Sequence, residues 1–74
     1  MGNLTAAIRE NLMVSDKEYQ RLYDEHERYD HELMELESKR FLTENDQVEE
    51  VRLKKLKLRA KDRMEELVQR AKSA

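Results

Sequence analysis

The chain has 74 residues, of which 43% are charged and 38% hydrophobic, and its formal net charge is −2. It contains one Gly and no Pro, Cys or Trp. This length allows one small domain at most, and the lack of Cys excludes disulfides and thiolate zinc sites. Few turn-forming residues argue against a β-sandwich or barrel, and so short a chain encloses no substrate-sized pocket. We therefore expect an all-α protein that is not an enzyme and has no cofactor or small-molecule substrate.

The first segment, residues 1–14, is predicted to be an N-terminal arm or a short helix. Leu4, Ile8 and Leu12 recur in it at helical spacing. Ser15 comes next and is followed three residues later by Glu18, which is the pattern of a capping box at the start of a helix. The sequence therefore predicts that a new helix starts at about residue 16.

Residues 15–74 are predicted to form two long helices, at about 16–40 and about 44–72, joined by a loop at about 41–44. Thr43 and Asn45 are both suitable caps for the second helix. Each helix carries a stripe of mostly apolar residues spaced alternately by three and four, which is typical of coiled coils. These stripes are Tyr19, Leu22, His26, Tyr29, Leu33 and Leu36 in the first helix, and Leu53, Lys57, Ala60, Met64, Leu67 and Ala71 in the second.

The two stripes fall into one register when the chain folds back at the loop, so that Tyr19 meets Leu67. Charge favours the same arrangement. Residues 16–37 hold nine acids and three bases, whereas residues 52–72 hold nine bases and three acids. Helices of opposite charge attract each other when they lie side by side, which helps to select the partner and its orientation. We therefore predict an antiparallel two-helix coiled-coil hairpin with a short N-terminal segment, which is an arm or a short helix.

A set of charged and apolar positions on both predicted helices follows a pattern found in one protein family. The matching positions are His26, Asp30, Lys55, Lys57, Leu58, Lys61 and Asp62, and the positions that depart from the pattern are Tyr29, Ala60 and Arg63. In these positions the chain resembles the YdcH-like family, short bacterial proteins catalogued as a domain of unknown function. The resemblance runs roughly from residue 11 to residue 68. It implies a two-helix hairpin in a bacterial protein and implies no established function.

Polar residues interrupt the predicted seam between the helices. An ammonium group such as that of Lys57 is costly to bury, so we expect Lys57 to reach Asp30 across the hairpin and fix its alignment. A metal site at His26, Asp30 and His31 is a weak alternative, because His31 lies about 140° around an ideal helix from His26. We predict a structural polar layer of His26, Asp30 and Lys57, and no bound metal.

Further apolar residues lie off the seam and have no partner within the hairpin. Two outcomes are open: the N-terminal segment covers them as a third helix, or two or more hairpins associate through them. We favour self-association, because domains this small usually need extra burial and two-fold dimers are the commonest oligomers. The N-terminal residues Leu4, Ile8 and Leu12 then form a mobile arm. The candidate partner contacts are Tyr23, Met34, Val51, Leu56 and Leu58.

The second predicted helix also carries many bases, which are suited to holding phosphates. No aromatic residue lies between them to stack on bases of a single strand, and the acidic helix beside them weakens their attraction for anions. The favoured hypothesis is therefore a protein-interaction or structural module, which forms a homo-oligomer or binds a helical protein partner. Nucleic-acid or anionic-surface binding is the alternative, through Arg52, Lys54, Lys55, Arg59, Lys61 and Arg63.

No apolar run in the sequence approaches the roughly 18 residues of a membrane span. The N-terminus also lacks the charged start and apolar stretch of a secretory signal. We therefore expect a cytoplasmic protein.

Overall fold

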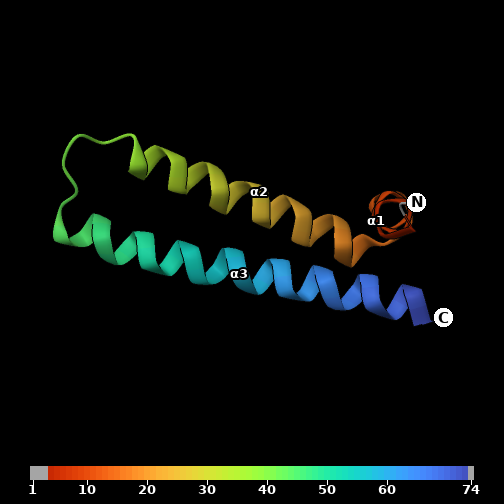
Figure 1. Ribbon diagram of the computed structural model, residues 1–74. Helices are drawn as coiled ribbons and strands as arrows, with labels where there is room; N and C mark the ends of the chain where they lie inside the picture. The colour runs from red at the N-terminus through yellow and green to blue at the C-terminus, as the bar shows by residue number, and fades with distance from the viewer. Residues whose placement is uncertain (1–3, 74) are drawn as a thin grey trace.

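The computed structural model describes residues 4–73, which form three helices and no strand. The helices are α1 (Leu4–Ser15), α2 (Lys17–Glu37) and α3 (Glu44–Ser73). α2 and α3 lie side by side and run in opposite directions, and α1 crosses them at the end away from the loop (Figure 1). Residues 1–3 of the predicted arm and Ala74 lie outside the described residues. The prediction of an all-α fold is confirmed.

The break between α1 and α2 lies at Asp16. Its backbone is extended (φ −114°, ψ 112°), and its carboxylate accepts a hydrogen bond from the backbone N–H of Tyr19 at 3.0 Å. The prediction that Ser15 and Glu18 cap this helix is wrong. Ser15 is the last residue of α1, and its hydroxyl donates to the carbonyl of Asn11 at 2.7 Å. Asp16 caps α2 instead, because a carboxylate is a strong acceptor at the positive end of a helix dipole.

The loop between α2 and α3 starts about one turn earlier than predicted, because α2 ends at Glu37. The hydroxyl of Ser38 donates to a carbonyl of the last turn of α2, a local bond that competes with continuation of the helix. Thr43 begins α3. Its hydroxyl accepts from the N–H of Asp46 at 3.0 Å, and its own N–H donates to the Asp46 carboxylate at 3.1 Å. The other candidate cap, Asn45, lies within the first turn of α3.

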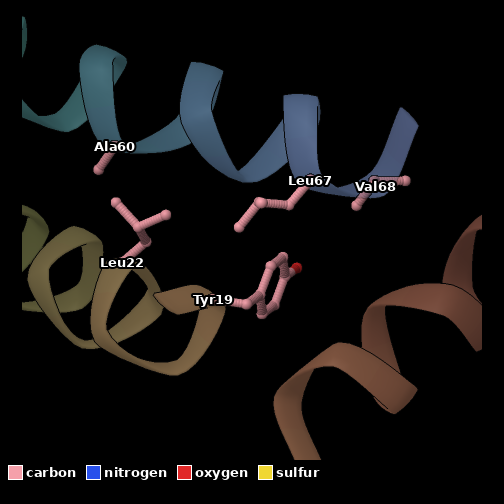
Figure 2. Packing of buried hydrophobic residues seen from close by; sticks show 5 residues of the cluster. All are labelled: Tyr19, Leu22, Ala60, Leu67 and Val68. Atoms are coloured by element: carbon pink, nitrogen blue, oxygen red, sulfur yellow. The ribbon is translucent and has the colours of Figure 1, made fainter. Parts of the chain in front are cut away.

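The first of two core clusters lies at the open end of the α2–α3 pair, which is the end away from the loop. Its buried members are Tyr19, Leu22, Ala60, Leu67 and Val68. Figure 2 shows Tyr19 against Leu67 and Leu22 opposite Ala60. Val68 is absent from the predicted stripe, yet its exposure is 0%. Side chains of α1 pack against this cluster and widen it beyond the seam.

The second core cluster lies near the loop. Leu33, Leu36 and Leu53 are buried together, and Tyr29 packs against them. The Leu53 side chain is only 1% exposed to solvent. The cluster contains side chains of α2 and α3 alone, all of them from the predicted stripes. The core is therefore divided along the rod, with a three-helix cluster at the open end and a two-helix cluster at the loop end.

The N-terminal segment, predicted as an arm or a short helix, is a third helix that docks on the pair, and the favoured mobile arm is corrected. Ile8, Leu12 and Met13 of α1 pack, partly buried, against the open-end cluster, whereas Leu4 stays exposed. Burial explains the difference: a helix with a weak apolar stripe is held by tertiary packing and not by its own propensity. α1 covers the open end, however, and not the off-seam apolar residues that the sequence left without a partner.

Candidate interaction surface

A groove runs between α2 and α3 along one side of the pair. It consists of two adjoining hollows that share Lys61, and α1 bounds the hollow at the open end through Arg9. Three predicted partner contacts line the groove and remain exposed: Tyr23 by 39%, Met34 by 62% and Leu58 by 56%. We call Tyr23, Met34 and Leu58 the groove triad.

Helix geometry explains why the groove triad gathers on one side. Tyr23 and Met34 are eleven residues apart, which is about three turns, so they share one side of α2. Leu58 and Lys61 are three residues apart and share one side of α3. Because α2 and α3 are packed together, these two sides meet along the same groove.

The other two predicted partner contacts lie elsewhere. Val51 lines a separate hollow with Val48, near the start of α3. Leu56 is half-buried and lines neither part of the groove. It is two residues from Leu58, a spacing that places two side chains on different sides of a helix. The sequence pattern showed that all five residues lie off the seam, and the packing decides which of them lie together.

The two edges of the groove carry opposite charges. The α2 edge is acidic and the α3 edge is basic, so the charge difference between the whole helices is repeated along this surface. The acidic residues that line the groove from α2 are Glu27, Asp30 and Glu37, and the basic residues that line it from α3 are Lys54, Lys57 and Lys61. The open-end hollow also holds one acid of α3, Glu65, which pairs with Arg9 of α1.

An ion pair between Asp30 and Lys57 bridges the two edges. The Lys57 ammonium donates a hydrogen bond to the Asp30 carboxylate, and this bond lowers the pKa of the Asp30 carboxyl. Both side chains are about one-third to two-fifths exposed, so solvent screens the pair. His26, the third residue of the predicted polar layer, lines the groove one turn before Asp30. The structure thus brings Asp30 and Lys57 together and leaves His26 beside them.

A second ion pair across the helices was missed by the sequence analysis. The guanidinium of Arg63 donates to the two carboxylate oxygens of Glu18 at 2.9 and 3.2 Å and to Glu66 at 2.7 Å. These bonds lower the pKa of Glu18 and raise the pKa of Arg63. The opposite net charges of the helices indicated such attraction, but they could not show which residues pair. Arg63, predicted to hold anions, is occupied by this pair.

The remaining candidate anion-binding residues do not form a single face. Arg52 and Lys54 pair with acids of α3 itself. Lys54 and Lys61 line the groove. Lys55 and Arg59 are exposed and lie one turn apart on another side of α3. The predicted basic face is therefore divided between two sides of the helix, and part of it is neutralised within the protein.

Taken together, these features define a small all-α protein built on a packed pair of oppositely charged helices with an open groove between them. Within residues 4–73, no three or more His, Cys, Asp or Glu side chains are grouped so as to hold a metal ion. None of the three described helices combines the length and apolar character needed to cross a membrane.

The family of the chain follows from its sequence. Residues 20–68 match a family described as protein of unknown function (DUF465). This match covers more than half of the chain, so the protein belongs to that family, which includes the YdcH-like proteins. The matched range takes in most of α2, the loop and most of α3, and it leaves out α1. Comparisons with curated proteins and with solved structures found no match.

Proposed function

We propose that this protein is a helical interaction module and not an enzyme, in which α2 and α3 form an antiparallel coiled-coil hairpin and the groove binds a second copy. The observation that carries the proposal is the exposure of the groove triad, Tyr23, Met34 and Leu58, in one groove. α1 folds onto the same helix pair and leaves these side chains exposed. Apolar residues gathered on a small surface in this way are typical of interaction sites.

The charges along the groove favour a second copy as the occupant. A two-fold axis that runs along the groove places the acidic α2 edge of one copy over the basic α3 edge of the other, in both directions. A two-fold axis across the groove instead places acid over acid and base over base. Complementary charge thus selects one of the two arrangements and steers the encounter.

The expected association is weak. The triad is already partly buried, so closing the groove gains less than full burial of three side chains would. Association also costs translational and rotational freedom. The dimer should therefore form in a concentration-dependent manner and not persist at high dilution.

Sedimentation velocity over a range of concentrations tests this proposal. The wild-type protein should shift from monomer to dimer as its concentration rises. Leu58→Glu should weaken the dimer that forms through the groove, because it places a charge in the closed groove. Val48→Glu is the matched control, since Val48 is exposed on α3 outside the groove, and it should dimerise as the wild type does. A wild-type monomer at the highest soluble concentration would contradict the proposal, as would a Leu58→Glu variant that dimerises as readily as the Val48→Glu variant.

A second candidate function is the binding of an anionic surface or nucleic acid, and the exposure of Lys55 and Arg59 one turn apart supports it. It has less support, because Arg52, Lys54 and Arg63 are already paired with acids. Fluorescence anisotropy with a labelled duplex tests it. Binding should weaken steeply with added salt, and K55E/R59E should remove it.

A further inference from the structure

The chain changes direction between α1 and α2 at a single residue. The N–H of Asp16 donates to the carbonyl of Leu12 at 2.9 Å, and its carbonyl accepts from the N–H of Gln20 at 3.1 Å. Both are the i to i−4 bonds of an α-helix, so helical bonding reaches Asp16 from both sides. Residues 12–20 contain neither Gly nor Pro. A change in the backbone angles of Asp16 alone would therefore join α1 and α2 into one continuous helix.

The polar groups at the break have partners in either state. In the bent state the Gln20 side-chain amide donates to the carbonyls of Met13 at 2.6 Å and Val14 at 3.2 Å. In a continuous helix these two carbonyls would accept from the N–H groups of Lys17 and Glu18, four residues on. Straightening therefore leaves no backbone group of this stretch without a partner, and packing of α1 decides which state forms.

The packing of α1 is conditional on the open-end cluster. No residue of α1 is fully buried. Ile8, Leu12 and Met13 nevertheless pack on a cluster that includes the fully buried Val68. A straight α1–α2 helix would carry α1 about 18 Å beyond the pair, given 12 residues at 1.5 Å each. It would expose both the α1 side chains and the cluster that they cover, unless another α1 took the vacated place.

We propose that α1 exchanges between two copies of this chain. Asp16 becomes helical, α1 continues α2, and its Ile8, Leu12 and Met13 pack on the open-end cluster of the second copy. A two-fold axis makes the exchange reciprocal, so the packing of α1 on an open-end cluster is kept and the helix gains a continuous backbone. A hinge of one residue favours such exchange, because a short connection leaves a domain little freedom to close on itself. This interface adjoins the open-end hollow of the groove, but it involves none of the groove triad.

Mixed cross-linking tests the exchange. Arg9 of α1 and Glu65 of α3 are exposed and lie within 3.3 Å of each other, and the chain has no Cys of its own. R9C and E65C chains are prepared separately, mixed, incubated at high concentration and treated with a short bismaleimide. If α1 exchanges, the main product joins an R9C chain to an E65C chain, as mass spectrometry of the linked peptides would show. Like-with-like links alone would overturn the proposal.

Two hinge variants make the test quantitative. Asp16→Ala removes the cap of α2 and inserts a strong helix former, so the exchanged population should rise about 5-fold per hinge. Lys17→Pro should reduce the mixed link to background, since Pro fits the first position of a helix but blocks a continuous one. The residue before Pro favours the extended angles that Asp16 already has. Equal mixed linking in both variants would also overturn the proposal.

The groove dimer and the exchange fail independently. Leu58→Glu weakens dimerisation through the groove and leaves the R9C–E65C link between chains intact if α1 exchanges. If the wild type dimerises while R9C and E65C chains give only like-with-like links, the groove interface stands and the exchange is excluded.

Discussion

The two ends of the helix pair are stabilised in different ways. At the loop end, two helices enclose Leu33, Leu36 and Leu53, and the chain itself connects them. At the open end the chain provides no connection between α2 and α3, and a third helix packs over the cluster that contains Val68. Two packed helices are sufficient to enclose a core cluster where a short loop keeps them from separating. Where the ends are free to separate, the protein adds burial from another element.

The loop end should show the largest effect of a single substitution. Leu53→Ala removes most of a side chain that is 1% exposed, so it should lower the free energy of unfolding by about 3 kcal/mol. Urea denaturation followed by circular dichroism measures this change. Leu58→Ala on the same helix should cost about 0.5 kcal/mol or less, since Leu58 is 56% exposed. Similar losses in the two variants would remove the distinction between core and groove.

The open end should respond to changes in α1. Leu12→Glu should detach α1 and lower the free energy of unfolding by about 2 kcal/mol. Burial raises the pKa of Tyr19, so detachment should bring this pKa down toward about 10. Ultraviolet titration in a Y23F/Y29F background isolates Tyr19. Leu4→Glu is the control, because Leu4 is exposed on the same helix; it should leave the pKa of Tyr19 unchanged. If the pKa of Tyr19 were unchanged in the Leu12→Glu variant, packing of α1 would not be the cause of its burial.

The loop contributes a smaller effect through the cap of α3. Thr43→Ala removes the hydroxyl that accepts from the N–H of Asp46, and it should lower the free energy of unfolding by about 1 kcal/mol. Thermal unfolding measures the loss. Asn45→Ala, within the first turn, should change stability much less. If Asn45→Ala were the more damaging of the two, Asn45 would be the functional cap.

The smallest effects concern the ion pairs that join α2 to α3. The pKa values of Glu18 and Asp30 are lowered in the folded state by hydrogen bonds from Arg63 and Lys57. Between the lowered value and the ordinary one, near 4, the unfolded chain binds more protons than the folded chain. The stability that these two carboxylates contribute is therefore present above that window and is lost as the pH falls through it.

Thermal unfolding from neutral to acidic pH tests this dependence. Asp30→Asn and Glu18→Gln should each flatten the acid loss of stability, because they remove a carboxyl that titrates in this window. A double-mutant cycle of Asp30→Asn with Lys57→Met measures the coupling directly. Additive effects in the cycle would show that the pair does not fix the alignment of the helices.

The long helices and their seam follow from local properties of the sequence. The absence of Pro, the spacing of apolar residues by three and four, and the opposite charges predicted two long helices packed on each other, with Tyr19 against Leu67. Helix formation and amphipathic spacing act over a few residues, so the sequence expresses them directly. Boundaries were predicted less well. Ser15 and Asp16 are neighbouring candidates for one cap, and only the end of the preceding helix decides between them.

The candidate site was predicted as a set of residues but not as a surface. Tyr23, Met34 and Leu58 share the groove, whereas Val51 and Leu56 lie apart. All five are recognisable as off-seam positions from their spacing. Their grouping depends on how α2 and α3 are rotated against each other, which is a property of the packed pair.

The sequence by itself determined the helical class, the seam of the long helices and the opposite charges along them. Periodicity and charge are local properties, set by the identity and spacing of neighbouring residues. The tertiary structure alone decided that α1 docks at the open end, that Val68 is buried there, and that Arg63 pairs with Glu18. These features depend on contacts between segments far apart in the chain. Their energies exist only once the helices are placed side by side.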